Sequence, residues 1–366
     1  MQSPDVFIIG GGPAGLAAAI AVRQRGFEVA LADGSRPPID KACGEGLMPD
    51  ACVALATLGI SIPPGESHPF RGINFVSNGL SVDASFPEGV GVGIRRTALH
   101  CLLIARAEAV GVSMLWQTPI TGLHPEGVCI GRQVVRARWV IGADGRNSLV
   151  RRWAGLERGR QRRRFAFRQH FRASPWNDCM EVHWGPKSQI YVTPVGEREI
   201  CIAVASRKPH MRLNEALEAF PEIASRLRGT ACSSTERGAI SSTFELRHVH
   251  RGHVALIGDA AGSVDCITGE GLGLAFRQAD LLGDCLRQGD LARYQRQHAA
   301  LARRPTLMSR LLLALDASSA LRRRAMCAFE NEPELFRRVV AMHVGSLSSF
   351  DCAANALVLG WRMLKA

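Results

Sequence analysis

Apolar residues near the start of the chain follow first a strand pattern and then a helix pattern. Residues 6–9 form a continuous apolar run, which is typical of a parallel strand buried on both faces. Residues 14–24 carry alanine and leucine at helical spacing and stop at Arg25 and Gly26. Residues 27–32 are a second apolar run. The pattern therefore predicts a strand–helix–strand unit.

Similar patterns recur along the rest of the chain. Strands are predicted around residues 112–116 and 134–141, and a helix runs from Arg96 toward Val110. From Asp290 onward the pattern is helical, and Leu307, Leu311, Leu312 and Leu315 are expected on one stripe.

The middle third of the sequence alternates between apolar and polar residues over short stretches. Pro, Asn and Gly separate these stretches, so residues 160–240 predict a β-rich layer followed by a helical pair at 210–227, interrupted at Pro221. Phe165, Phe167 and Phe171 share one strand face, either as core or as the wall of a pocket. The four predicted strands of the layer cover residues 165–171, 179–184, 189–194 and 199–205.

Three glycine motifs follow directly after apolar runs. The first is Gly-x-Gly-x-x-Gly at residues 10–15, the second is Gly-Ala-Asp-Gly at 142–145, and the third is Gly-Asp at 258–259, followed by Thr-Gly-Glu-Gly at 268–271. One such motif is a weak signal. Three motifs in this order, each at the end of a predicted strand, predict a nucleotide-binding protein.

Each position of the first motif has a physical role in dinucleotide binding. Gly10 permits the tight turn, Gly12 lets the backbone approach a pyrophosphate, and Gly15 lets the helix pack closely on the strand. The helix N-terminus presents free N–H groups to the phosphates. Asp33 lies 18 residues beyond Gly15, near the ~20-residue spacing at which an acid binds a ribose hydroxyl. An acid here favours a ribose without a 2′-phosphate.

Composition is consistent with a soluble enzyme of about two domains. Hydrophobic residues make up 46% of the 366 positions, no apolar run reaches 18 residues, and no secretory signal precedes the first strand. The 11 cysteines form no C-x-x-C pair, so we expect reduced thiols in the cytoplasm and neither a disulfide framework nor a metal site.

The net charge of +12 comes almost entirely from arginine. Dense runs lie at residues 158–164 and 322–324. A basic surface attracts anionic partners such as a carrier protein, but a solvated arginine-rich surface is the favoured interpretation of the runs. No aromatic-interleaved basic motif accompanies them, so nucleic-acid binding is not expected.

The three motifs resemble those of the FAD-dependent monooxygenase superfamily, which includes aromatic hydroxylases, flavin halogenases and geranylgeranyl reductases. The segment Lys41-Ala-Cys-Gly-Glu-Gly-Leu-Met-Pro49 resembles a Gly-Glu segment of the halogenases and the Cys-Gly-Glu-Gly segment of the reductases. Arg96-x-x-Leu99 is similar to the family's Arg-x-x-Leu, whose arginine contacts FAD. The resemblance covers about residues 1–290 and implies that Asp259 binds the ribityl chain.

The resemblance implies an α/β fold with three parts. A Rossmann-like FAD-binding domain is discontinuous, over residues 1–65, 95–155 and 240–290. A β-sheet substrate domain takes residues 66–94 and 160–239, and residues 291–366 form a C-terminal helical region.

Motifs and resemblance together predict a set of cofactor-binding residues. Catalytic residues cannot be assigned from the sequence, and His170, Tyr191 and Asp265 are the candidates, each of which could equally be structural. The predicted cofactor-binding residues are Gly10, Gly12, Pro13, Ala14, Gly15, Asp33, Lys41, Cys43, Gly44, Arg96, Asp144, Gly258, Asp259, Gly269, Glu270 and Gly271.

The resemblance implies an FAD-dependent monooxygenase that acts on a hydrophobic or aromatic metabolite, possibly carrier-bound, through a flavin C4a-hydroperoxide. Flavin halogenases need a lysine and carry a Trp-x-Trp segment. This chain has no lysine between Lys41 and Lys187 and no Trp-x-Trp, so halogenation is disfavoured. With no second Gly-x-Gly-x-x-Gly unit, electrons are expected from NAD(P)H binding transiently or from a partner reductase. The alternatives are a geranylgeranyl-reductase-like enzyme that reduces carbon–carbon double bonds, and a non-catalytic flavoprotein that binds a carrier or partner protein. The oligomeric state is not predicted.

Overall fold

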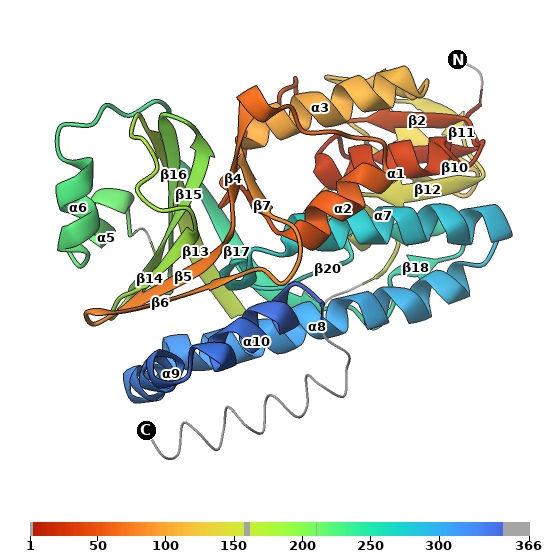
Figure 1. Cartoon of the computed structure of the whole chain (residues 1–366). Helices are drawn as coiled ribbons and strands as arrows, with labels where there is room; N and C mark the ends of the chain where they lie inside the picture. The colour runs from red at the N-terminus through yellow and green to blue at the C-terminus, as the bar shows by residue number, and fades with distance from the viewer. Residues whose placement is uncertain (1–2, 157–161, 210, 347–366) are drawn as a thin grey trace.

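Two β-sheets lie at opposite ends of the molecule, and helices link and cover them (Figure 1). The computed structural model describes residues 3–156, 162–209 and 211–346. The first part of the arginine run at 158–164, the first residue of the predicted helical pair and the last 20 residues of the predicted helical region lie outside these ranges.

The first sheet has six strands in the order β18-β19-β12-β1-β2-β8. All neighbours are parallel except the pair β18 and β19. Parallel strands that are distant in sequence therefore end at the same edge, where ligands bind in open α/β sheets. The strands are β1 (Val6–Ile9), β2 (Val29–Ala32), β8 (Ser113–Leu115), β12 (Trp139–Gly142), β18 (His250–Arg251) and β19 (Val254–Leu256).

Helices cover this sheet with small and aliphatic side chains. α1 (Pro13–Arg23) is almost completely buried, since Leu16 to Val22 are inaccessible to solvent and pack between the strands and α7. α7 (Gly271–Gln288) and α3 (Arg96–Ala109) both contact α1. α2 (Pro49–Thr57) packs on α7. The strand–helix–strand unit expected from the sequence is confirmed by this packing.

The second sheet has eight strands in the order β20-β17-β13-β16-β15-β14-β5-β6. It is antiparallel except where β14 pairs with β5. Its β13–β16 run corresponds to the four strands that alternation predicted. The strands are β5 (Gly72–Ser77), β6 (Leu80–Ser85), β13 (Arg162–Phe171), β14 (Met180–Trp184), β15 (Ser188–Gly196), β16 (Glu199–Ser206), β17 (Arg237–Glu245) and β20 (Gly262–Ser263).

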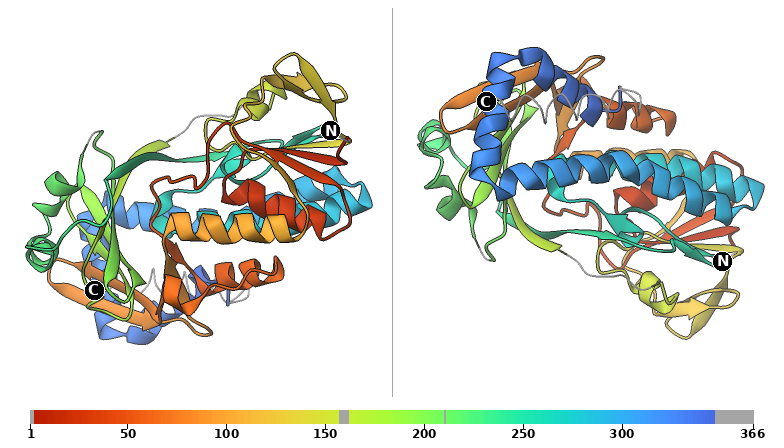
Figure 2. Two further views of the ribbon diagram at one scale, coloured as in Figure 1. Left: turned by 90° about the horizontal axis from the view of Figure 1, so that it is seen from above. Right: turned by 90° about the horizontal axis from the view of Figure 1, so that it is seen from below.

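The two faces of this sheet have different partners. One face packs on α5 (Leu213–Leu217) and α6 (Pro221–Leu227). The other packs on α8 (Leu291–Ala317), α9 (Ser319–Asn331) and α10 (Pro333–His343). Seen from below, α8 runs along most of the molecule, from the parallel sheet to the antiparallel one (Figure 2).

Smaller elements complete the fold. A three-stranded sheet, β3-β7-β4, lies between the two large sheets, and a second, β11-β10-β9, flanks the parallel sheet. α4 (Leu149–Trp153) follows β12. The strands are β3 (Gly46–Leu47), β4 (Ser67–Phe70), β7 (Gly91–Ile94), β9 (Gly122–His124), β10 (Gly127–Ile130) and β11 (Gln133–Arg136).

The structure confirms the α/β fold with a Rossmann-like sheet, an antiparallel sheet and C-terminal helices. The single strand expected at 134–141 was wrong: it divides into β11 and β12, which pair in different sheets. Leu307 is 51% exposed, because the buried stripe of α8 instead runs through Met308, Leu312 and Leu315 at i, i+4, i+7 spacing.

Other expectations about surfaces also need correction. Phe171 belongs to the core that the sheet forms with α5 and α6, and Phe167 packs against it, so neither lines a pocket on the opposite face. Arg164 and Arg322, each at one end of an arginine run, are buried rather than solvated. Among the described residues, no helix combines the length and hydrophobicity needed to cross a membrane.

Candidate functional site

The three glycine motifs meet at the carboxyl edge of the parallel sheet. A Cβ atom added to Gly10 would lie 2.5 Å from the carbonyl oxygen of Ala143, in the second motif. A Cβ atom on Gly258, in the third motif, would lie 2.7 Å from the Cβ of Ala14. Backbones this close leave no space for side chains, so glycine is required where the motifs touch.

The first motif combines one crowded and one open glycine. A Cβ on Gly15 would lie 1.8 Å from the carbonyl oxygen of Gly10, so helix and strand are in direct contact here. At Gly12, by contrast, no protein atom lies within 4 Å of the Cβ position. Pro13 is the first residue of α1, so the free N–H groups of the helix N-terminus follow directly after this open position. The arrangement fits a pyrophosphate bound at a helix N-terminus.

Asp33 follows β2 and supports the glycine turn. Its Oδ2 accepts a hydrogen bond from Gly11 N at 2.7 Å, and its Oδ1 accepts one from Ser35 N at 2.7 Å. On the other side of the turn, His100 Nε2 contacts the carbonyl of Gly11 at 2.7 Å, and burial lowers the pKa of His100. The neutral ring therefore donates from Nε2. The role of His100 was not predicted, because a single histidine within the helix that Arg96 begins belongs to no motif.

Positive side chains gather around the Gly-Asp motif. Lys41 and Arg96 both interact electrostatically with Asp259, and a Cβ on Gly145 would lie 3.8 Å from Lys41 Nζ. The Nε atom of Arg96 is buried and has no hydrogen-bond partner. A buried guanidinium nitrogen without an acceptor fits a site that receives polar groups of a cofactor. These residues fit the polar groups of FAD.

Asp144 of the second motif holds the first turn of α4. Its Oδ2 accepts hydrogen bonds from the N–H groups of Leu149 (2.6 Å) and Val150 (3.1 Å), in the first turn of α4. Arg151 in the same helix donates to the carbonyl of Ala260 at 2.9 Å. The second motif thus fixes α4, and α4 fixes the loop of the third motif.

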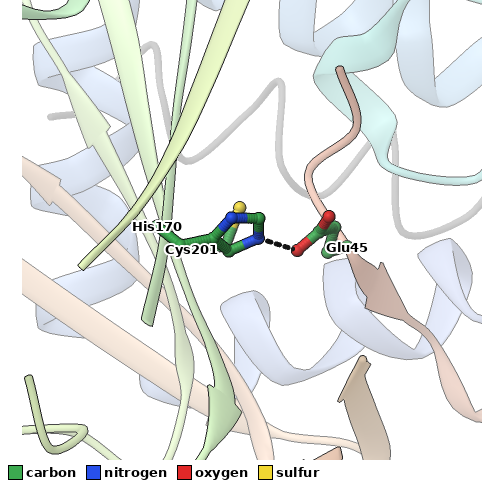
Figure 3. A group of neighbouring side chains, drawn as sticks. All are labelled: Glu45, His170 and Cys201. Carbon is green, nitrogen blue, oxygen red and sulfur yellow. Dashed lines mark hydrogen bonds and ion pairs between the residues drawn. The ribbon is translucent and has the colours of Figure 1, made fainter. Parts of the chain in front are cut away.

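Glu45, His170 and Cys201 form a buried cluster between the two large sheets (Figure 3). Glu45 precedes β3, and its backbone has a φ of 60°, which is rare for a residue with a side chain. Its Oε2 lies 2.5 Å from His170 Nε2, and its Oε1 accepts a hydrogen bond from Arg96 N at 3.0 Å. Cys201 Sγ donates to the carbonyl of Cys43 at 3.8 Å.

The cluster is a hydrogen-bonded network rather than a metal site. The ligand atoms of its three residues lie within 4.8 Å of one another, a spacing that could hold a metal ion. Arg168 Nη2, however, lies 3.6 Å from Glu45 Oε1, and burial raises the pKa of the Cys201 thiol well above its ordinary value. A protonated thiol and a neighbouring guanidinium both disfavour a cation. His170 Nδ1 instead contacts the Ser234 hydroxyl at 2.8 Å.

The other two catalytic candidates, Tyr191 and Asp265, lie in a separate cluster. The Tyr191 hydroxyl donates to Gln189 Oε1 at 2.9 Å, and Arg164 Nη1 lies 3.3 Å from Asp265 Oδ1. Burial raises the pKa of Tyr191 well above its ordinary value, so the phenol stays protonated. Asp265 Oδ1 also accepts from Ile267 N at 3.1 Å. This cluster fixes the loop after Gly-Asp against the antiparallel sheet.

An apolar pocket lies between the antiparallel sheet and the C-terminal helices. Two polar side chains, Thr268 and His343, contribute to a lining that is otherwise apolar. The pocket encloses about 30 Å³, room for one or two water molecules, so a larger ligand must displace its walls. The apolar lining residues are Ile73, Phe75, Met180, Val182, Trp184, Ile267, Met308, Leu312, Phe336, Val339 and Val340.

The remaining predicted residues lie in the segment before β3 and in the loop before α7. Cys43 and Gly44 immediately precede Glu45, and Cys43 Sγ accepts from Glu45 N at 3.4 Å. Gly269 takes a left-handed φ of 66° and ends the turn after Asp265. Gly271 begins α7. The side chain of Glu270 turns toward α8 and α10 and is buried there.

Comparisons with known proteins agree with this geometry. The model of a family described as "FAD binding domain" matches residues 3–289. A menaquinone reductase of Mycobacterium tuberculosis is 27% identical, over 80% of this chain and 78% of that protein. A digeranylgeranylglycerophospholipid reductase of Methanocella arvoryzae is 26% identical, over 79% of each. The crystal structure of a 2-methyl-3-hydroxypyridine-5-carboxylic acid oxygenase is 25% identical with a TM-score of 0.69, over 84% of this chain and 88% of that one. The resemblance expected from the three motifs is thereby confirmed.

Proposed function

Because this chain belongs to the FAD binding domain family, we propose that it is an FAD-dependent oxidoreductase that reduces carbon–carbon double bonds of a long apolar, isoprenoid-like substrate. The observation that carries the proposal is the apolar pocket beside the Gly-Asp loop, with Ile267 and Thr268 of that loop in its wall. The similarity to two reductases named for isoprenoid lipids supports it.

The cofactor would be held by the residues around the three motifs. The first turn of α1 would bind the pyrophosphate through its N–H groups, with Gly12 leaving room for its approach. Asp33 would accept a ribose hydroxyl, and Asp259 with Arg96 would bind the ribityl chain and ring. Bound FAD would supply hydride chemistry, and the protein would supply binding, orientation and exclusion of water.

The chain's own residues would keep the reaction dry and the substrate oriented. Phe75, Trp184 and Phe336 would contact the hydrocarbon chain of the substrate after the walls of the pocket move apart to admit it, since they line the pocket. Burying such a chain gains about 25 cal/mol per Å² of apolar surface. The buried network of Glu45, His170 and Arg168 would fix the segment that borders the cofactor site.

Transfer of an oxygen atom to an aromatic substrate is the second candidate. It is favoured by the similarity to the pyridine carboxylic acid oxygenase, at 25% identity. The Asp265-Cys266 pair weighs against it, because the resemblance to aromatic hydroxylases implies proline residues around these two positions. For either reaction we propose NAD(P)H or a partner reductase as the electron source.

One experiment separates the two candidates. FAD-loaded enzyme, reduced with dithionite under argon, is mixed with geranylgeraniol or a menaquinone, and the products are identified by mass spectrometry. After reoxidation in air, which returns any menaquinol to the quinone, a gain of two hydrogens in the isoprenoid chain without an added oxygen atom supports the proposal. Products that form only with oxygen present, and that have gained an oxygen atom, would replace it by the monooxygenase reaction.

A further inference from the structure

A buried acid–base pair, Glu270 and His343, lies at the polar end of the apolar pocket. His343 Nδ1 lies 3.6 Å from Glu270 Oε2, and the two side chains are 6% and 2% exposed. The ring of His343 lines the pocket. Nδ1 of His343 and Oε2 of Glu270 have no hydrogen-bond partner, while Oε1 of Glu270 forms an ion pair with Arg304.

Charged residues of α2, α7 and α8 surround the pair. Arg304 of α8 lies 3.1 Å from Glu270 Oε1 and 2.8 Å from Asp50 Oδ2, and Arg277 of α7 lies 2.5 Å from Asp50. Two carboxylates thus face two guanidiniums, with the His343 ring beside them.

The surroundings of Glu270 suit the transfer of a proton between the buried pair and solvent. Burial raises the pKa of Glu270, opposed by the charges of His343 and Arg304. Asp50 and Arg304 are 21% and 24% exposed, so the network leads from the buried pair toward solvent. A group with this access can be reprotonated after each turnover.

We propose that His343 is the proton donor to the substrate in the apolar pocket, and that Glu270 orients and reprotonates it. This inference rests on the proposed function. Saturation of a double bond needs a hydride and a proton: one carbon takes a hydride, for which reduced flavin is the source, and the other carbon takes the proton. The C=C π bond breaks, two C–H bonds form, and the N–H electron pair stays on the imidazole.

The inference is tested with His343→Asn, Glu270→Gln and the control His183→Asn, all loaded with FAD. His183 is a matched control, because it forms another buried histidine–glutamate pair, 2.9 Å from Glu181, on the sheet face away from the pocket. The first measurement is the NMR signal of the His343 ring in the FAD-loaded protein. Glu270→Gln should shift that signal at constant pH, because the ring loses the carboxylate 3.6 Å from its Nδ1, whereas His183→Asn should leave it in place.

The second measurement is the rate of geranylgeraniol saturation after reduction by dithionite. His343→Asn should lower this rate about 100-fold or more, as expected for loss of a general acid, with FAD still bound, while His183→Asn stays within about twofold of the wild type. A His343→Asn rate close to that of an active wild type would overturn the donor role, and an unchanged His343 signal in Glu270→Gln would overturn the pairing. If the wild type saturates neither geranylgeraniol nor menaquinone, the proposed function fails together with the donor role, whereas the NMR signal still decides whether the two side chains are paired.

Discussion

The contact between Gly258 and Ala14 predicts that two substitutions are strongly coupled. Gly258 has a φ of +59°, and a Cβ there would lie 2.7 Å from the Cβ of Ala14. Gly258→Ala should cost about 1 kcal/mol for the left-handed backbone and about 1–3 kcal/mol for overpacking. Ala14→Gly should cost about 1 kcal/mol, since glycine weakens a helix.

The double variant should be less destabilised than the sum of the two changes. Without the Ala14 methyl group, only the two backbone costs remain, about 2 kcal/mol in total against about 3–5 kcal/mol for simple addition. The free energies of unfolding are measured by urea denaturation at a fixed FAD concentration. Gly26→Ala is the control, because Gly26 has a φ of +88° and no atom within 4 Å of its Cβ position, so it tests the backbone cost alone. Additivity of the two substitutions to within about 0.5 kcal/mol would refute the predicted contact.

Three further predictions concern single residues. Gly12→Ala should leave thermal stability unchanged yet weaken FAD binding about tenfold or more, about 1.4 kcal/mol, in a fluorescence titration; tight binding would argue that the pyrophosphate lies elsewhere. Burial lowers the pKa of His298 to about 4, so the folded state holds this ring neutral and loses roughly 3 kcal/mol of stability as pH falls from about 6.5 to about 4. His298→Gln should flatten this part of the pH–stability curve, and an equally steep curve would contradict the assignment. Burial also raises the pKa of Cys266 to about 12, so iodoacetamide at pH 7.5 should modify the exposed Cys101 and leave Cys266 intact, as peptide mass spectrometry can show.

The sequence predicts the parts of this protein that depend on local geometry. The glycines of the first motif and the short alternating strands are set by backbone conformation and by periodicity, both of which are visible along the chain. The boundary between β11 and β12 was missed, because one apolar stretch serves two sheets. Leu307 was wrongly assigned to the buried stripe of α8. The stripe begins one residue later, at Met308, and the two choices have nearly the same spacing along the helix.

The candidate site beyond the glycine motifs could not be predicted in the same way. Glu45 and His170 are 125 residues apart and meet only because β13 lies against the segment before β3. His343 and Glu270 come together through the path of α8 and α10. Histidine and glutamate at such separations have no recognisable spacing, so tertiary structure alone identifies them. The burial of Arg164 could not be predicted either, since a run of arginines does not indicate which member is buried.

The strand order of the parallel sheet has a consequence for how the protein is made. β12 pairs with β1 on one side and with β19 on the other, and β19 follows β12 by roughly 110 residues, which a ribosome needs roughly 6 to 22 s to add. During that interval the nascent chain carries an apolar strand with one open edge, which other chains can pair with. We therefore expect the yield of folded protein to fall when many chains are made at once, and to recover when a chaperone protects that edge.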